Sequence, residues 1–185
     1  MNYDSEAICE LRIPNQEIKV VFNTEILRNL KNLVSPSISK RLRVALFTTN
    51  SALFVETIHE FLLQSASNYD TSSESFYYGM VLGMLSVVSD NYQVRSNREA
   101  GTGRFDIQLE PRKPDLPGFL FEFKTKKDLE DPELERLAET GLKQIKTKEY
   151  TIELESRNIY PIHLYGVGFS GKKVAVKHEV VENRS

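Results

Sequence analysis

Cysteine and histidine are scarce in this sequence, and their scarcity excludes several classes of small protein. A single cysteine among 185 residues leaves no intrachain disulfide, and the three histidines stand far apart. Their spacing does not match that of a zinc site. Long hydrophobic runs are also missing, since the longest, Met80 to Val88, is too short to cross a bilayer. The acidic start has no signal-peptide pattern, so we expect a cytoplasmic protein with no membrane as a partner.

Positive charge is not in excess either. The 24 lysine and arginine residues are outnumbered by 26 aspartate and glutamate residues, and the net charge is -2. The chain as a whole is therefore not attracted to nucleic acid, and any polyanion must bind to a local patch. Hydrophobic residues make up 40% of the chain. This value is ordinary for a globular protein and argues against a disordered or coiled-coil chain.

The first part of the chain has the pattern of a helical segment without obvious chemistry. Apolar residues from Ile18 to Leu30 recur at three- and four-residue spacing, which predicts an amphipathic helix. A second short helix is expected over Leu42–Phe47, and Asn50 or the serine after it is expected to cap a third. A polar stretch then reads as a linker. We therefore expect a helical connector or packing segment, residues 1–70, followed by a second domain, residues 71–185.

The second domain alternates between helical and strand patterns. An apolar helix is expected first, then three strands, a helix with a strong start signal, and a final hairpin. This order predicts an α/β fold. The expected elements are a helix over about Ser73–Ser89, strands over Tyr92–Asn97, Gly103–Glu110 and Gly118–Lys124, a helix from Asp131 to about Ser156, and strands over Tyr160–Phe169 and Lys173–Lys177.

The first hairpin of this domain brings two acidic residues together. If the phenylalanine-rich faces of both strands pack on one core, with Phe105 and Ile107 on that face, the register sets Asp106 opposite Glu122. Facing carboxylates repel each other. A divalent cation between them would replace this repulsion by attraction to the cation, and Mg²⁺ prefers hard oxygen ligands of this kind. Lys124 points to the same side, where its ammonium group can hold water or balance charge on a phosphate. The alternative is that these charges merely line a solvated face of the sheet.

These residues resemble the signature of the PD-(D/E)XK nuclease superfamily, in which an aspartate is followed by an acid, any residue and a lysine. Here Asp106 is followed, after fifteen residues, by Glu122-Phe123-Lys124. Flanking blocks are similar, in the same order, to one family of longer prokaryotic proteins in which the nuclease domain follows an AAA-ATPase-like domain. The similar blocks are Glu74–Gly83, Ser96–Asp106, Phe121–Lys124, Leu142–Tyr150 and Tyr165–Val174.

The resemblance implies a fold, a cofactor and the central residues of a site. The implied fold is a restriction-endonuclease-like αβββαβ core, a mixed central sheet flanked by helices, with an N-terminal helical segment. Asp106 and Glu122 are the implied metal ligands for Mg²⁺ or Mn²⁺, and Lys124 is the implied catalytic lysine. The carbonyl group of Phe123 is a further implied metal ligand.

The resemblance also points to residues around this centre. Glu74 matches an acidic residue that often assists the metal, although Thr71-x-x-Glu74 also fits a capping box at a helix start. Tyr78 departs from the family pattern, which often has histidine there, and receives no role. Gln144 and Tyr150 resemble a helix-borne motif that supports exonuclease-like sites, at wider spacing, and also fit a plain polar helix face. Expected phosphate contacts, each of which also fits an ordinary surface charge, are Arg98, Arg104, Lys143 and Lys146.

Three functions remain open on the sequence alone, of which the least specific is a plain interaction domain. The first is a metal-dependent nuclease that hydrolyses phosphodiester bonds, with DNA as the expected substrate, and the complete set of acids and lysine favours it. The alternative is a non-catalytic or weakly catalytic nucleic-acid-binding or regulatory module that works with an ATPase domain or partner. The sequence contains no P-loop motif, so we expect no nucleotide site of that kind in the chain.

Overall fold

The computed structural model describes residues 34–65 and 74–183, which contain helices and one sheet. The helix predicted over Ile18–Leu30 lies outside the described residues, as does most of the polar stretch before residue 74. The described elements are α2 (Pro36–Phe47), α3 (Ser51–Ser65), α4 (Glu74–Leu85), a 3-10 turn (Ser86–Val88), β1 (Tyr92–Ala100), β2 (Gly103–Pro111), β3 (Gly118–Thr125), α5 (Asp131–Thr147), α6 (Ile152–Ser156), β4 (Ile162–Ser170) and β5 (Lys173–Val181).

The five strands form one mixed sheet in the order β1-β2-β3-β4-β5. Strands β1, β2 and β3 pair antiparallel, β3 pairs parallel with β4, and β4 pairs antiparallel with β5. The parallel pair needs a crossover, which α5 supplies. The order α4, β1, β2, β3, α5, β4 is the predicted αβββαβ core, so the predicted fold class is confirmed.

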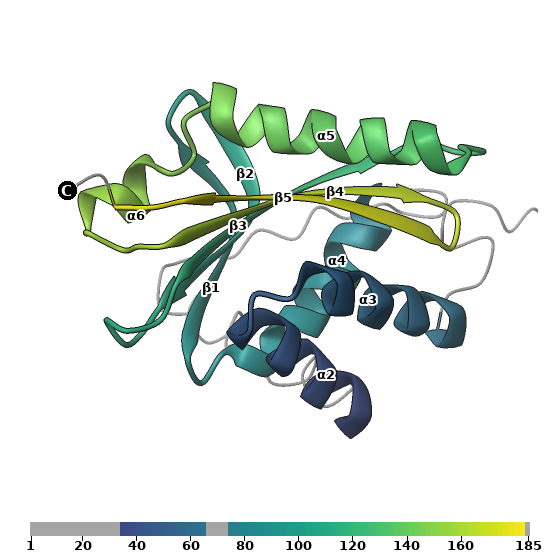
Figure 1. The fold of residues 1–185 in the computed structure, drawn as a ribbon, viewed down its shortest axis with the longest axis horizontal. Helices are drawn as coiled ribbons and strands as arrows, with labels where there is room; N and C mark the ends of the chain where they lie inside the picture. Colours follow the sequence, from purple (N-terminus) through teal and green to yellow (C-terminus); the bar gives the residue numbers. More distant parts are fainter. Residues whose placement is uncertain (1–33, 66–73, 184–185) are drawn as a thin grey trace, which may run out of the picture.

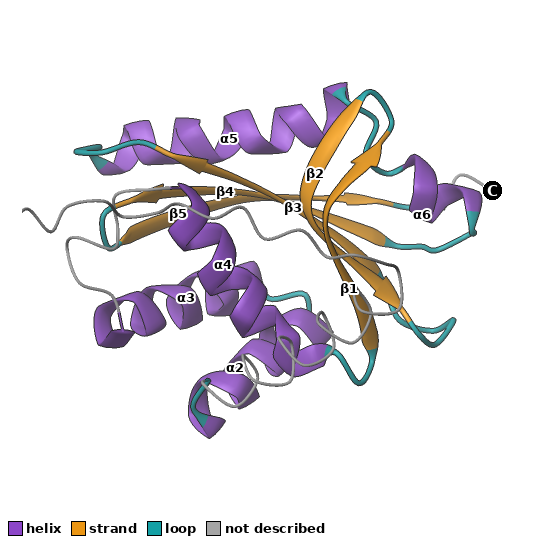
Figure 2. Ribbon diagram, turned by 180° about the vertical axis from the view of Figure 1, so that it is seen from behind, coloured by secondary structure: helices purple, strands orange, loops and turns teal. Residues whose placement is uncertain are grey.

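Helices cover both faces of the sheet (Figure 1). Helix α5 lies along one face, whereas α2, α3 and α4 lie on the other, as the view from behind also shows (Figure 2). Side chains of α2 and α3 share one hydrophobic cluster with α4 and the strands, including Leu42, Phe54 and Phe121. A second cluster lies on the side of α5 and α6 and contains Leu120 and Ile145.

The N-terminal ends of the first two described helices follow from their capping residues. The Ser35 side chain accepts a hydrogen bond of 3.3 Å from the Ile38 N–H, and Pro36 takes the first helical position. Helix α2 therefore begins well before Leu42, where the sequence predicts it to begin. The predicted cap of α3 is confirmed, because Asn50 Oδ1 accepts 2.9 Å from the Leu53 N–H.

The helix predicted from Asp131 to about Ser156 is in fact two helices. Helix α5 ends at Thr147, and Glu149 takes a positive φ of 55°, which interrupts the helix before α6 begins. The start of α5 at Asp131 agrees with the prediction. Glu130 is the capping residue, and its side chain and that of Glu133 form a capping box.

Small residues let α5 lie directly on the sheet. A Cβ atom added at Gly166 would lie 2.2 Å from the Ala138 carbonyl oxygen, and one at Gly168 would lie 2.9 Å from that of Leu134. On the helix side, a Cβ at Gly141 would stand 3.0 Å from a main-chain oxygen of β3. Side chains at these positions would force the layers apart, so the glycines set how closely α5 approaches β3 and β4.

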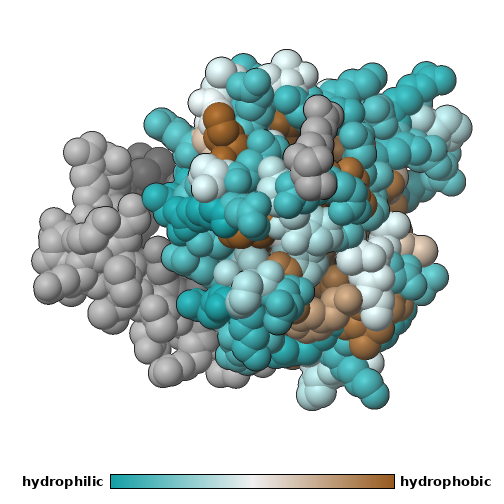
Figure 3. All heavy atoms as spheres, turned by 60° about the vertical axis from the view of Figure 1, so that its left-hand side comes forward, coloured by the Kyte–Doolittle hydropathy of each residue, from teal (hydrophilic) through white to brown (hydrophobic). Residues whose placement is uncertain are grey.

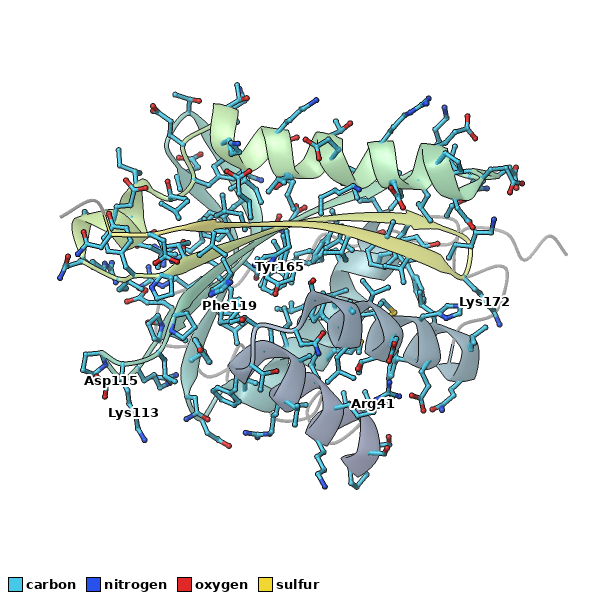
Figure 4. The ribbon with its side chains drawn as sticks, viewed as in Figure 1. Arg41, Lys113, Asp115, Phe119, Tyr165 and Lys172 are labelled. Atoms are coloured by element: carbon cyan, nitrogen blue, oxygen red, sulfur yellow. The ribbon has the colours of Figure 1, made fainter. Side chains whose placement is uncertain are left out.

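Aromatic rings stack on the opposite face of the sheet, where Figure 4 shows Phe119 and Tyr165 between the strands and the lower helices. The Tyr165 ring stacks on that of His178, with centroids 4.5 Å apart. His163 Nδ1 and His178 Nε2 share a hydrogen bond of 2.9 Å. Burial lowers the pKa of both imidazoles, to about 4 for His163, where the neighbouring His178 adds to the effect. The pair is therefore held neutral.

The outer surface is largely polar. On the face shown in Figure 3, hydrophilic side chains predominate and hydrophobic areas lie scattered among them. In the described ranges, no helix is both long and apolar enough to span a bilayer.

Candidate active site

Regular strand pairing is interrupted at Asp106. On one side of β2, Ser96 pairs with Ile107 and Arg98 with Phe105, while the pair between them, opposite Asp106, is missing from the regular β1–β2 ladder of the described residues. On the other side, the ladder between β2 and β3 ends at Ile107 and its partner Phe121. The main chain at Asp106 is thus released from regular pairing on both sides.

The predicted register of the first hairpin is confirmed. Ile107 pairs with Phe121, and continuing this register by one residue brings Asp106 beside Glu122. Asp106 Oδ2 accepts a hydrogen bond of 2.7 Å from the Phe123 N–H, so a side chain replaces the main-chain acceptor at this point. The bond fixes the Asp106 carboxylate next to β3.

Phe105 departs from the prediction, which places it on the same core face as Ile107. Ile107 belongs to the hydrophobic cluster under α2, α3 and α4, whereas Phe105 belongs to the cluster on the side of α5. There its ring meets Tyr150 edge-on, with centroids 6.2 Å apart. The simple alternation of faces does not hold across Asp106 because regular pairing is interrupted there.

Glu122 is buried, with 2% of its surface exposed. Its Oε1 accepts hydrogen bonds from Lys124 Nζ, at 2.8 Å, and from Gln144 Nε2. Gln144 Nε2 also lies 3.2 Å from the Tyr150 hydroxyl. Helix α5 and the turn that follows it therefore cover the polar side of the hairpin, and the alternative of a solvated sheet face is wrong for Glu122.

Burial and mutual repulsion disfavour the ionised form of both carboxyl groups. Burial raises the pKa of Glu122 to about 7, and the charge of Asp106 adds to the rise, while Lys124 and the main chain of Asp106 oppose it. Burial also raises the pKa of Asp106, against the opposing effects of the Phe123 N–H and Lys124. A divalent cation beside these groups would favour the ionised forms.

The donor set fits a hard divalent cation. Glu122 Oε2 is fully buried and has no hydrogen-bond partner in the described part of the chain. A buried carboxylate oxygen without a partner is costly, and a cation would satisfy it. Mg²⁺ commonly takes only one or two carboxylates and completes its shell with water and substrate phosphate. Within residues 34–65 and 74–183, no three acidic, histidine or cysteine side chains cluster as a metal site, so a cation at this place would have two carboxylates as its side-chain ligands.

Glu74 lies at the edge of this centre. It is exposed, it begins α4, and its charge contributes to the raised pKa of Asp106. Thr71, its possible capping partner, lies outside the described residues. A metal-assisting role for Glu74 therefore stays a prediction, as does a ligand role for the Phe123 carbonyl.

A polar cluster that the sequence does not reveal adjoins Asp106. The Tyr78 side chain lies near those of Ser96 and Asn97, which lower its pKa, but burial, with a smaller contribution from the Asp106 charge, raises the pKa on balance. One signal was available, because Tyr78 is four residues after Glu74 and so shares a face of α4 with it. Nothing in the sequence indicates that Ser96 and Asn97 lie beside Tyr78, because the predicted strand ends at Asn97, whereas β1 extends to Ala100.

The predicted phosphate contacts lie on two elements that touch each other. The tip of the β1–β2 hairpin packs on the end of α5, where the Thr102 N–H donates 3.0 Å to the Lys148 carbonyl. Lys146 pairs with Glu179 at 2.9 Å. In the described part of the chain, the other three have no ion-pair partner. All four predicted contacts are exposed, namely Arg98 and Arg104 on the hairpin and Lys143 and Lys146 on α5.

Comparisons with known proteins agree with this geometry. Residues 72–179, more than half of the chain, match the family model of a PD-(D/E)XK nuclease superfamily. The chain has no match among the curated proteins. A solved structure described as "Crystal structure of SSO0001" is similar over 91% of this chain and 80% of its own, with 14% identity and a TM-score of 0.29. That similarity is too low to bear on fold or function.

Proposed function

Because the chain belongs to the PD-(D/E)XK nuclease superfamily, we propose that it is a metal-dependent nuclease that hydrolyses phosphodiester bonds in DNA. The observation that supports this most is the buried Glu122 Oε2, which has no hydrogen-bond partner among the described residues and lies in a site shared with Asp106 and Lys124. Such an oxygen destabilises a fold unless something binds there. Mg²⁺ or Mn²⁺ is the proposed cofactor.

Each residue of the centre has a distinct role in this proposal. Asp106 and Glu122 would hold a divalent cation, which would supply Lewis-acid stabilisation of charge on the phosphate and a lower pKa of bound water. Lys124 Nζ uses one donor on Glu122, which leaves two donors for the attacking water or a phosphate oxygen. Gln144 holds the Glu122 carboxylate from the side of α5. The Phe123 N–H holds Asp106 in place.

The surroundings of the centre extend the proposal. Arg98 and Arg104 on the hairpin, with Lys143 and Lys146 on α5, are proposed to contact the phosphates of the strand, because such contacts position a nucleic acid. The family resemblance in the sequence leads us to propose an ATPase domain or subunit as a partner. We also propose a cytoplasmic location, as the single cysteine leads us to expect.

The test combines metal binding with cleavage. We expect Mn²⁺ and Mg²⁺ to bind the wild-type chain in calorimetric titration, and the protein to cut labelled DNA only when one of them is present. Asp106→Asn and Glu122→Gln should abolish both metal binding and cleavage. Lys124→Met should abolish cleavage but leave metal binding, because its ammonium group is not a metal ligand.

Matched controls come from the loop between β2 and β3, at the other end of these strands. Asp115→Asn and Lys113→Met make the same chemical changes at exposed positions (Figure 4) and should leave both readouts unchanged. A wild-type protein that neither binds metal nor cuts single-stranded DNA, double-stranded DNA or RNA would overturn the proposal. The non-catalytic binding or regulatory module would then be the better account.

A further inference from the structure

The polar cluster beside Asp106 of β2 joins two elements of the fold. Tyr78 comes from α4, whereas Ser96 and Asn97 come from β1, and the Tyr78 side chain lies close enough to both of theirs for them to lower its pKa. Tyr78 and Ser96 are half-buried, and Asn97 is exposed. The cluster therefore leads from the Asp106 carboxylate outward to the surface.

Asn97 has a backbone conformation that a strand does not require. Its φ is 49°, and it is the one residue with a side chain and a positive φ inside a described strand, since the others lie in turns and loops. Such conformations are rare in residues with a Cβ, and they concentrate at functional sites. Here the conformation coincides with the gap in the β1–β2 ladder opposite Asp106.

The chemistry of the cluster suits one ligand class. It offers a tyrosine hydroxyl, a serine hydroxyl and an amide, all neutral hydrogen-bonding groups, together with an aromatic ring. Phosphate and sugar oxygens accept bonds from such groups, and bases stack on aromatic rings. A second phosphate lies one nucleotide away from any phosphate held at the centre. In the proposed nuclease, a cation held by Asp106 and by Glu122, whose buried Oε2 has no hydrogen-bond partner among the described residues, would hold the scissile phosphate.

We propose that Tyr78, Ser96 and Asn97 form a subsite for the nucleotide next to the scissile phosphate, with the Tyr78 hydroxyl donating to an oxygen of its backbone. The subsite rests on the proposed nuclease function. Tyr78 acts here as a substrate-binding residue, and it binds the ground state and the transition state equally well. Uniform binding of this kind changes KM and leaves kcat nearly constant.

The first test removes the hydroxyl and keeps the ring. Tyr78→Phe should raise the KM for a labelled DNA oligonucleotide about tenfold, because a hydrogen bond to a charged group is lost, and should leave kcat within about twofold. Tyr160→Phe is the matched control, since Tyr160 is also half-buried and lies in the segment before β4. An unchanged KM in Tyr78→Phe, or a fall in kcat alone, would overturn the subsite.

The second test separates binding from folding. Asn97→Gly keeps the positive φ at no steric cost, so the midpoint of thermal unfolding should not fall, while the KM should rise. Asn158→Gly makes the same change at a φ of 54° in an exposed turn and should leave KM unchanged. A lower unfolding midpoint with unchanged KM would assign Asn97 to structure alone and overturn its part in the subsite.

A binding assay distinguishes failure of the subsite from failure of the nuclease proposal. Anisotropy of a fluorescent oligonucleotide in Ca²⁺ reports binding whether or not cleavage occurs. If the wild type binds without cutting in Mn²⁺, and both cluster variants bind about tenfold more weakly, the nuclease proposal falls and the subsite stands. If the wild type cuts and both cluster variants match it, the subsite alone falls. A wild type that neither cuts nor binds overturns both.

Discussion

Replacement of Glu122 by glutamine tests whether the centre stores unfavourable electrostatic energy in the absence of metal. Glu122 is 2% exposed, and its Oε2 has no hydrogen-bond partner among the described residues. Glutamine keeps the shape and can still accept the bond from Gln144, but it cannot ionise. We therefore expect the metal-free variant to be more stable than the wild type wherever Glu122 is ionised.

The magnitude follows from the pKa of Glu122. Burial, with the charge of Asp106, raises it from 4.5 to about 7. At about 1.4 kcal/mol per tenfold change in an ionisation equilibrium, this rise corresponds to about 3 kcal/mol. Because the fold favours the protonated acid, this contribution to stability is fully present below the unfolded pKa and is lost as the pH rises through the folded pKa. The advantage of the variant should thus grow by about 3 kcal/mol between about pH 4.5 and about pH 8.

The wild-type pH profile alone would hide this effect. Burial lowers the pKa of His163 from 6.5 to about 4, so the fold favours its neutral form, and that contribution is lost as the pH falls. The two groups therefore change stability in opposite directions over the same pH range. The difference between wild type and Glu122→Gln cancels the histidine contribution and isolates the glutamate.

Urea denaturation followed by far-ultraviolet circular dichroism measures this difference, with EDTA present throughout. The chain has no tryptophan, so circular dichroism is preferable to fluorescence. Asp115→Asn removes a negative charge from an exposed loop and controls for net charge. If the stability difference between wild type and Glu122→Gln is the same at both ends of the pH range, the account of Glu122 as a destabilised acid is refuted.

Three further predictions concern the supports of the fold and site. Gly166→Ala should lower the free energy of unfolding by about 3 kcal/mol or more, because the new Cβ would lie 2.2 Å from the Ala138 oxygen. Gly79→Ala in α4, where a Cβ would have nothing within 4 Å, should raise it by about 1 kcal/mol. Similar unfolding free energies for the two variants would contradict the close helix–sheet contact. As the pH falls from 6.5 toward 4, protonation of His163 should lower the stability of the wild type by about 3 kcal/mol. His163→Phe should abolish this contribution. If stability changes equally with pH in both proteins, the histidine pair is not buried and neutral. Tyr150→Phe removes a hydroxyl 3.2 Å from the amide that holds Glu122, so we expect a several-fold lower kcat with a stability loss of about 1 kcal/mol; an unaltered kcat would show that this hydroxyl does not position the centre.

The core of the candidate site was accessible from the sequence because strand geometry is regular. Side chains alternate with a period of two, so once both phenylalanine-rich strands face one core, only registers of one parity remain. That reasoning places Asp106 beside Glu122, and the pairing of Ile107 with Phe121 confirms the register. Helix caps are equally local, and Asn50 caps α3 as predicted.

What the sequence did not reveal depends on contacts between distant segments. No glycine or proline marks the end of α5, where Glu149 takes a positive φ and Tyr150 turns into the core. The interruption of strand pairing at Asp106 likewise has no local signal in the sequence. Because of this interruption, Phe105 and Ile107 do not share one face of the sheet, although simple alternation predicts that they do. In both places tertiary packing overrides a regular local pattern.

Burial, more than charge, bears on whether catalysis or binding alone is the better reading. An exposed pair of Glu122 and Lys124 would be an ordinary surface ion pair, worth little to stability and uninformative about chemistry. Under α5 the same glutamate loses its water, and one of its oxygens has no hydrogen-bond partner in the described part of the chain. A module that only binds nucleic acid has no need of a destabilised acid, and glutamine would serve its fold better. A metal-dependent reaction requires that acid, so a variant that gains stability and loses cleavage together would favour catalysis over mere binding.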